Sequence, residues 1–363
     1  MTQTVQAEMQ ASDNIGANLI INGDMRIAQR GTSFVSPSNG NYLMDRWAQF
    51  IGGATVWTIT QDTDVPTVAE AGVDFNTSMK IDVTTADASI AAGDLAFVTQ
   101  KIEGLNWAQL GYGAAGAKDV TVSFWLKSDT KTGVLGVSIR NSAVNRSYPV
   151  DVTISDNNWN KYTVTIPGDT SGTWLTTNGI GAYIGFTLAA GADYQSTGST
   201  WSAANGICTS NQDNFVDSAT NNIWITGVKL EVGSTATDFV PDDYATALAK
   251  CQRYYVEYVQ GGTQNMTGFA VGINNFNGDF SLAQWMRASP TVDFENDTTN
   301  WETFTQGPST ETSLTSVTGF LAGSGTSNII GWAANKSSAW TAGDVGQLRV
   351  TSGTEKITID AEL

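Results

Sequence analysis

The sequence predicts an all-β protein, with a two-sheet β-sandwich followed by a short helix and a second, smaller β domain. Three observations predict this class. Short apolar runs rich in strand-forming residues recur along most of the chain, with Gly, Asn, Asp, Ser and Thr between them. Only 15% of the 363 residues are charged, and the chain is long enough for two or three domains. A single segment after residue 240 changes to a helical period.

The domain boundaries follow from these changes in pattern. Residues 1–17 are polar and aperiodic, so we expect an arm that becomes ordered only on a neighbouring surface. The sandwich is expected at 18–240, an amphipathic helix or linker at 241–258, and a C-terminal β domain at 259–363.

Nine short runs predict the strands of the sandwich, and their even spacing is typical of a two-sheet arrangement. They are NLIIN (18–22), YLMDRWAQF (42–50), TVWTIT (55–60), SMKIDVT (78–84), VTVSFWLKS (120–128), VLGVSIRN (134–141), KYTVTIPG (161–168), AYIGFTLA (182–189) and IWITGVKLEV (223–232). In residues 120–128 the inward set is Val120, Val122, Phe124 and Leu126. Because side chains alternate along a strand, Trp125 is expected on the opposite, polar face.

The last of these strands changes its alternation at Gly227. Ile223 and Ile225 share one face, whereas Val228 and Leu230 continue that face one residue out of step. One extra residue in a strand is a β-bulge, and glycine accommodates the unusual backbone angle that a bulge needs. We therefore predict a bulge at Gly227.

The segment after the bulged strand predicts the helix. Pro241 with a cap at Asp242 or Asp243 would begin it, and basic residues near its end suit the negative end of the helix dipole. Its apolar stripe is Tyr244, Leu248, Cys251 and Tyr255. Cys251 is expected as a buried thiol within this stripe, and the only other cysteine, Cys208, is expected on a loop, so no disulfide framework is predicted.

Weaker strand patterns follow the helix and predict the second β domain. They are TGFAVGI (267–273), DFSLAQW (279–285), PTVDF (290–294), SNIIGWAA (327–334), QLRVTSG (347–353) and KITIDAEL (356–363).

Charge and hydropathy exclude several classes of partner. The net charge is −17 and no cluster of Lys and Arg stands out, which argues against nucleic acid and anionic membranes. No apolar run is long enough to span a bilayer, and the first residues lack the basic and apolar parts of a signal peptide. We therefore expect synthesis in a cytoplasm without membrane insertion.

The chain contains no histidine, which removes the commonest general base and most zinc sites. No pair of carboxylates stands out as a glycosidase pair. We expect no enzyme activity, no catalytic residues and no cofactor.

Tryptophan carries the remaining functional signal, because flat sugar faces stack on aromatic rings. Five tryptophans in polar surroundings are the glycan-binding candidates, although packing in the core is an alternative for each: Trp57, Trp107, Trp125, Trp174 and Trp201.

Several motifs together resemble a domain of bacteriophage structural proteins of the minor tail or fibre type. In order they are NLIINGDMRIAQRGTS (18–33), YLMDRW (42–47), QKIEG (100–104), VTVSFWLKS (120–128), NNWNKYTVTIPG (157–168), ITGVKLEVGSTATDF (225–239), LAKCQRYY (248–255), MRASPTV (286–292) and DAEL (360–363). The family is similar in turn to carbohydrate-binding modules, which implies that the sandwich is a jelly roll.

The same resemblance bears on metal binding. Such modules often hold a structural calcium ion through a carboxylate after the opening NGxF motif and an Asp in the last strand. Here Arg26 stands in the first position, and Thr226 with Gly227 replaces the second. Because calcium prefers several oxygen ligands, we expect no metal.

Two functions remain open. The first is a virion structural protein, a fibre, spike or decoration subunit of tail or head, which contacts other virion proteins through its arm, forms a homo-oligomer, with a trimer favoured, and presents the sandwich to a host-surface glycan. The alternative is a glycan-binding or glycan-processing (depolymerase) module. The resemblance favours the first.

Overall fold

A computed structural model of the chain describes residues 17–261 and, beyond them, 266–271, 275–295, 301–305, 312–314, 316–321, 329–335, 345–350 and 354–363. The chain divides into two compact units, Met1–Asp243 with Leu363, and Tyr244–Glu362. The predicted arm, apart from Ala17, lies outside the described residues.

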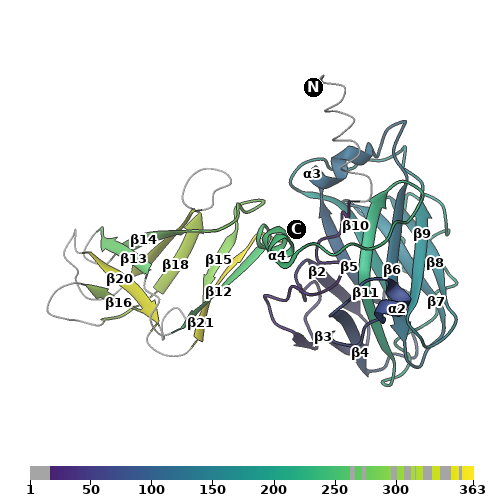
Figure 1. Cartoon of the computed structure of the whole chain (residues 1–363), viewed down its shortest axis with the longest axis horizontal. Coiled ribbons are helices and arrows are strands. Elements are labelled where there is room, and N and C mark those ends of the chain that lie inside the picture. The colour runs from purple at the N-terminus through teal and green to yellow at the C-terminus, as the bar shows by residue number, and fades with distance from the viewer. Residues whose placement is uncertain are drawn as a thin grey trace. The chain divides into compact units, whose positions relative to one another are not determined.

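The described part of the first unit is an antiparallel β-sandwich, which confirms the predicted all-β class (Figure 1). Sheet A has the strand order β1-β3-β4-β11-β6-β9 and sheet B the order β2-β5-β10-β7-β8. The strands of sheet A are β1 (Ser33–Val35), β3 (Val56–Asp62), β4 (Ser78–Thr85), β6 (Val120–Ser128), β9 (Asn160–Ile166) and β11 (Asn222–Val232). Those of sheet B are β2 (Trp47–Gly52), β5 (Leu95–Glu103), β7 (Gly133–Asn141), β8 (Ser147–Ile154) and β10 (Ile180–Ala190). Short helices α2 (Val68–Ala71), α3 (Gly104–Trp107), η1 (Ala108–Leu110) and η2 (Ala192–Tyr194) lie in the connections.

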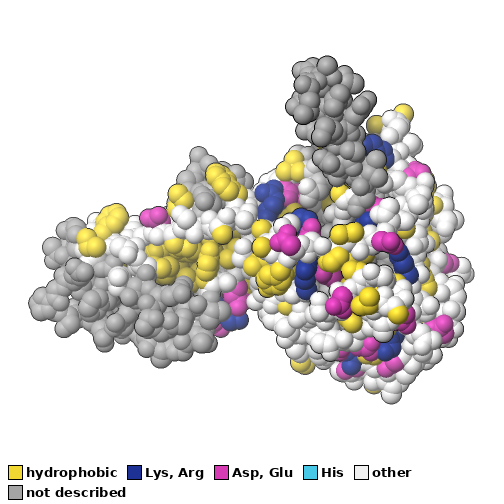
Figure 2. Space-filling view, in the orientation of Figure 1, with side chains coloured by type: hydrophobic (Ala, Val, Ile, Leu, Met, Phe, Trp, Pro, Cys, Tyr) yellow, Lys and Arg dark blue, Asp and Glu magenta, His cyan; other side chains and the backbone are white. Residues whose placement is uncertain are grey.

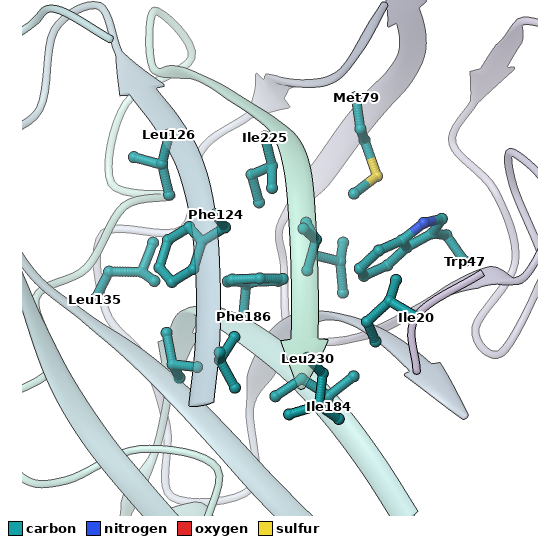
Figure 3. Packing of buried hydrophobic residues seen from close by; sticks show 14 of the residues in the cluster. Ile20, Trp47, Met79, Phe124, Leu126, Leu135, Ile184, Phe186, Ile225 and Leu230 are labelled. Carbon is teal, nitrogen blue, oxygen red and sulfur yellow. The ribbon is translucent and has the colours of Figure 1, made fainter. Parts of the chain in front are cut away.

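The core lies between the two sheets, as Figure 3 shows for the side chains of Phe124, Phe186 and Trp47. The ring of Phe124 on β6 meets that of Phe186 on β10 edge-on at 4.8 Å, and Trp47 on β2 lies 6.2 Å from Phe186. The inward residues predicted on β6 all belong to this core: Val120, Val122, Phe124 and Leu126. Burying one such side chain stabilises the fold by about 1.5–3 kcal/mol, so this double layer of apolar residues holds the sandwich together.

The opening segment does not form the strand predicted at 18–22. Asn22 has a left-handed backbone (φ 59°), and its side-chain amide donates to the carbonyl oxygen of Ile27 at 2.9 Å, which folds the chain into a turn. The segment is held to β11 by single hydrogen bonds, such as Leu19 N to the carbonyl oxygen of Leu230 at 2.8 Å. Gly23 lies so close to β11 that a Cβ atom there would come within 2.1 Å of the carbonyl oxygen of Val228.

The predicted bulge in β11 is confirmed. Gly227 has a φ of 60°, and the pairing of β11 with β6 shifts between Thr226 and Lys229. The extra residue shifts the alternation of side chains by one position. As a result, Ile225 before the bulge and Val228 after it both belong to the core and are fully buried.

One of the two outer strands of sheet B is β8, which contains Pro149. Proline has no N–H to give to a neighbouring strand and is tolerated at the edge of a sheet. On the far side of β8, Ser199 N donates to the carbonyl oxygen of Pro149 at 2.9 Å, and Ser147 and Ser202 exchange two backbone hydrogen bonds. The segment 199–202 therefore covers this edge.

The second unit begins with helix α4 (Tyr244–Gln252), which is shorter than predicted because strand β12 begins at Tyr255. Cys251 is buried, as predicted, whereas Tyr244 is exposed. Described strands form the sheets β12-β21-β15 and β17-β16-β20-β13-β14-β19-β18. They are β12 (Tyr255–Gly261), β13 (Met266–Ala270), β14 (Asn275–Ser281), β15 (Thr291–Phe294), β16 (Trp301–Thr305), β17 (Thr312–Ser313), β18 (Ser316–Leu321), β19 (Ile329–Asn335), β20 (Val345–Val350) and β21 (Thr354–Asp360). Each of the six strand patterns predicted for this domain overlaps one of these strands.

Candidate functional site

Trp57, the first of the predicted glycan-binding residues, is a core residue. Its ring is 1% exposed, and it points into the sandwich from β3 on the same side as Ile59. A ring without accessible faces offers no surface for a sugar, so the expected exposure of Trp57 is wrong. The alternation of Trp57 with Ile59 was the signal for this burial.

Three of the other candidates come together, but they pack on one another. Trp107 at the end of α3 stacks on Trp174 at 5.7 Å, and Trp201 meets Trp174 edge-on at 5.5 Å. Tyr112 contacts all three rings at 4.9 to 5.8 Å. Trp107 and Trp174 are buried in the main core, and Trp201 is partly buried against it, so the expectation of exposed rings is wrong for Trp107 and Trp174.

Trp125 lies on the outer face of sheet A, as its alternation predicts, yet it is only 8% exposed. The segment before β4 covers it: a Cβ atom at Gly227 would lie 2.6 Å from the ring of Phe75 and 3.1 Å from that of Trp125. Phe239 in turn packs on Phe75 at 5.3 Å. A polar-looking face is thus covered by the chain itself, and the predicted exposure of Trp125 is wrong.

A different set of residues forms a pocket on the outer face of sheet B. It has a volume of about 220 Å³ and combines aromatic rings, amides and one guanidinium group. We refer to it as the outer-face pocket. Its lining is Asn39, Phe50, Leu95, Phe97, Arg140, Val144, Tyr183, Tyr194 and Asn205.

The register of sheet B builds the floor of this pocket. Phe97 on β5 is paired with Phe50 on β2, and Tyr183 on β10 is paired with Arg140 on β7. A Cβ atom at Gly185 would lie 2.1 Å from Cζ of Phe97, so the ring of Phe97 lies over this glycine. These residues alternate with the core residues of the same strands, which is why their side chains all emerge on the outer face.

Arg140 forms the polar wall of the pocket and is 7% exposed. Its guanidinium carbon lies 4.9 Å from the ring centre of Phe97 and 5.2 Å from that of Tyr183, within the range of cation–π attraction. One nitrogen, Nη1, donates to Oδ1 of Asn205 at 2.6 Å. Burial lowers the pKa of Arg140 to about 10, which still leaves the side chain charged at neutral pH.

Tyr183 in the pocket keeps its proton at neutral pH. Burial raises the pKa of Tyr183, and the positive charge of Arg140 opposes this shift only in part. Neutral phenol groups can both donate to and accept from sugar hydroxyls.

The loop of residues 191–213, which we call the 191–213 loop, forms part of the wall of the pocket. It contributes Tyr194 and Asn205. Ile207 N donates to the carbonyl oxygen of Tyr194 at 2.8 Å, which ties the two arms of the loop together. A Cβ atom at Gly136 would come within 2.7 Å of Cβ of Cys208, so this loop lies directly on β7. Cys208, predicted on a loop, is buried here.

The same loop also lines a larger and more polar hollow of about 640 Å³. Its residues are Asp151, Gln195, Ser196, Thr197, Gly198, Ser199, Thr209, Ser210 and Asn211. Asp151 accepts hydrogen bonds from Thr209 Oγ1 at 2.7 Å and from Asn211 Nδ2 at 2.8 Å. With hydroxyl and amide groups in the majority, this hollow continues the hydrogen-bonding surface beyond the aromatic pocket.

The surface of the described residues carries mixed charges. On the face of the first unit drawn in Figure 2, Lys and Arg side chains are interspersed with Asp and Glu. No described helix is long and apolar enough to cross a membrane. No group of three or more His, Cys, Asp or Glu side chains that could hold a metal ion is found among the described residues.

No protein-family model matches the sequence, and no curated protein matches it. Solved structures show partial similarity. A bacteriophage CBA120 tailspike protein 4, crystallised as its enzymatically active domain, is 19% identical over 55% of this chain, with a TM-score of 0.29. This chain spans 21% of that one.

Two carbohydrate-binding modules are similar over more of their length. A family 11 module from Clostridium thermocellum, solved with a β-1,3-1,4-mixed-linked tetrasaccharide, is 10% identical over 57% of this chain and 99% of its own, with a TM-score of 0.30. A module named TmCBM61, solved with β-1,4-galactotriose, is 10% identical over 60% and 99%, with a TM-score of 0.28. By this measure each likeness is weak.

The sequence-based prediction of glycan-binding residues rests on tryptophan and therefore does not include the outer-face pocket, whose aromatic residues are Phe and Tyr. In VLGVSIRN the alternation places Gly136, Ser138 and Arg140 opposite the core residues, and this was the available signal. Arg140 meets Phe97 and Tyr183 only because β5, β10 and β7 are neighbours in sheet B. This pairing of strands could not be predicted from the sequence.

Proposed function

We propose that this chain is a non-catalytic glycan-binding subunit of a bacteriophage particle, which presents the outer face of sheet B to a host-surface polysaccharide. The observation that carries the proposal is the outer-face pocket, where the partly exposed rings of Tyr183 and Tyr194 lie beside the polar groups of Arg140 and Asn205. Rings that bind the faces of a sugar, with nearby groups for its hydroxyls, are what a glycan site requires.

Binding without hydrolysis suits the chemistry of the pocket. Glycoside hydrolysis requires two carboxyl groups on either side of the scissile bond in most enzyme families. The lining of the outer-face pocket contains neither Asp nor Glu, and Asp151 is the one carboxylate that lines the neighbouring hollow. The alternative of a depolymerase would need a second carboxylate at this surface.

The virion role is supported by the motifs that resemble phage structural proteins, above all NLIINGDMRIAQRGTS, VTVSFWLKS and ITGVKLEVGSTATDF. In this proposal the chain is made in the cytoplasm of the host bacterium and assembles into the particle. Residues 1–17 contact other virion proteins, and the subunit forms a homo-oligomer, with a trimer favoured.

The glycan role is tested with the double variant Tyr183→Ala and Tyr194→Ala. We expect it to lose binding on a glycan array and to lose competition with phage adsorption to host cells. The exposed Tyr244, which is 60% accessible and lies in the second unit, provides the control Tyr244→Ala. A double variant that folds and binds every glycan as the parent does would refute the site.

The virion role needs its own experiment. Gold-labelled antibodies against the purified chain should decorate phage particles in electron micrographs and show whether the subunit belongs to tail, head or collar. Particles that carry no label, from a lysate in which the chain is abundant, would contradict a virion role and leave glycan binding to be judged separately.

A further inference from the structure

Arg140 is a buried cation with no acidic partner among the described residues. Its side chain makes three contacts with described residues: the hydrogen bond to Asn205 and the cation–π contacts with Phe97 and Tyr183. Nε is buried and has no hydrogen-bond partner among the described residues. A guanidinium group has five N–H donors, and the N–H group on Nε is shielded from water and remains available to a ligand.

Two other shielded cations of the first unit, Arg146 and Lys229, are paired with carboxylates. Arg146 Nη2 lies 2.6 Å from Oδ1 of Asp169, and Lys229 Nζ lies 3.3 Å from Oε2 of Glu231. The chain has 35 acidic residues against 18 basic ones, so carboxylates are plentiful. Arg140, by contrast, faces a pocket with no acidic side chain in its lining.

A buried charge without a partner is costly, because transfer from water is compensated only by pairing and hydrogen bonds. The two aromatic rings compensate part of this cost. An anion that enters the pocket from outside would supply the rest, and its binding would be favoured by the charge that the fold already holds there.

We propose that the outer-face pocket recognises an acidic sugar through its carboxylate, which pairs with Arg140. This inference rests on the proposed glycan-binding function and names the class of its ligand. The sugar ring would lie against the aromatic rings, and its hydroxyls would reach Asn39 and Asn205. A volume of about 220 Å³ is below the ~300–1,000 Å³ of sites for drug-sized ligands, which suits one sugar residue of a chain.

A carboxylate fits the guanidinium group of Arg140 by shape. Arginine presents a planar fork that matches the two oxygens of a carboxylate, and it is always charged at neutral pH. Phosphate and sulfate groups can also present two oxygens to such a fork, so they serve as comparison ligands in the test.

The test compares acidic polysaccharides with their carboxyl-reduced products by isothermal titration calorimetry. The probes are polymers that contain glucuronate, galacturonate, mannuronate or sialate, each in native and reduced form, together with dextran sulfate and inorganic phosphate. We expect at least one native polymer to bind roughly 10- to 100-fold more tightly than its reduced form, the range expected for a charged hydrogen bond.

Three outcomes are decisive for the parent protein. Equal binding of native and reduced forms would overturn the acidic-sugar inference while glycan binding stands. Equal binding of dextran sulfate and the best native polymer would overturn the carboxylate assignment. No binding of any polymer would refute the inference and, if the glycan array is also negative, the proposed function.

Two variants of Arg140 test whether the preference for the native polymer depends on this residue. Arg140→Gln should abolish the preference for the native polymer, whereas Arg140→Lys should retain part of it. Lys118, which is exposed and does not line the pocket, provides the matched control Lys118→Gln with the same change in net charge. If Arg140→Gln folds and keeps the full preference, the assignment is wrong. If it does not fold, the Nε–H resonance of Arg140 in the parent decides, because this resonance must shift with the native polymer and not with the reduced one.

Discussion

The ring of Phe97 lies over Gly185, where a Cβ atom would come within 2.1 Å of Cζ of the ring. The two residues are two positions out of register on the neighbouring strands β5 and β10, in which Gly185 is paired with Thr99 and Phe97 with Thr187. Because glycine leaves this space empty, the ring can lie flat beside Arg140 and form the floor of the outer-face pocket.

Gly185→Ala tests this relationship. The added methyl group must displace Phe97 from Arg140, and overpacking of this kind costs about 1–3 kcal/mol of stability. We expect glycan binding to fall roughly 10-fold or more, since the floor of the site is moved. Gly93→Ala is the control, because a Cβ atom there has its nearest contact at 3.7 Å. A Gly185→Ala protein with unchanged affinity would show that the position of Phe97 is irrelevant to binding.

Trp107→Ala should destabilise the first unit. The ring is 1% exposed and packs on Tyr112 and Trp174, and removal of such a ring typically costs about 3–5 kcal/mol. Leu105, in the same helix α3, is 54% exposed, so Leu105→Ala should cost about 0.5 kcal/mol or less. Urea unfolding of both variants measures the difference, and similar midpoints would contradict the core role of Trp107.

The pH dependence of stability should report the Asp64 ion pair. Burial alone would raise the pKa of Asp64, but hydrogen bonds from Lys127 Nζ at 2.6 Å and Trp159 Nε1 at 2.9 Å hold it below its ordinary value. A lowered folded pKa means that the stabilisation is present above the unfolded value of about 4 and is lost as the pH falls through the folded pKa.

Asp64→Asn should therefore lower the free energy of unfolding at pH 7 by about 1 kcal/mol or less, because the pair is partly exposed. The difference from the parent should begin to shrink as the pH falls below ~4 and continue to shrink towards the folded pKa of Asp64, which urea titrations from pH 3 to pH 8 can follow. Asp238, whose side chain is 95% exposed and 3.5 Å from Lys161, gives the control Asp238→Asn, which should change little at any pH. A pH-independent loss in Asp64→Asn would point to packing instead of charge.

Removal of divalent metal should leave the protein unchanged. Arg26 occupies the position expected for a calcium ligand, and its Nε lies 3.1 Å from Oδ2 of Asp24. A bound ion would stabilise the folded state by mass action, so a chelator would then lower the unfolding midpoint. We expect a change of about a degree or less in differential scanning calorimetry. A fall of several degrees that calcium restores would show that a metal site exists.

The mass of the purified chain in solution tests the predicted oligomer. We expect a trimer by light scattering at micromolar concentration, because fibre and spike subunits close about a symmetry axis. Deletion of residues 1–17 provides the comparison for the role of the arm. A monomer whose arm is readily cut by protease would contradict both the oligomer and the proposed use of the arm.

Much of the fold could be predicted from the sequence, because the strand alternation of apolar residues and the helical spacing after residue 240 are both clear in it. The β6 strand was placed residue for residue at 120–128, and the bulge at Gly227 was located from one step in the alternation. The helix was predicted too long because Tyr255 happens to continue the helical spacing, although it begins β12. Strand β8 was missed, since Pro149 interrupts its pattern and only its place at the edge of the sheet permits it.

The site was harder to predict than the fold, because exposure depends on what covers a face. Alternation placed Trp125 correctly on the outer face of sheet A, but the segment with Phe75 that buries it is some 50 residues distant in sequence. Likewise, Phe97 and Arg140 belong to strands that are not neighbours in the sheet, and a glycine on the intervening β10 allows them to meet. Such long-range pairings are set by tertiary structure.

The covered edge of β8 has a consequence for any arrangement in which many copies of this chain are crowded together. An open strand edge recruits strands from neighbouring molecules and leads to aggregation. Here the chain's own residues 199–202 occupy that edge, and Pro149 has no N–H to offer an incoming strand. The edge of β8 therefore offers little to the sheet of an adjacent copy, and crowded copies are kept from joining their sheets along this strand.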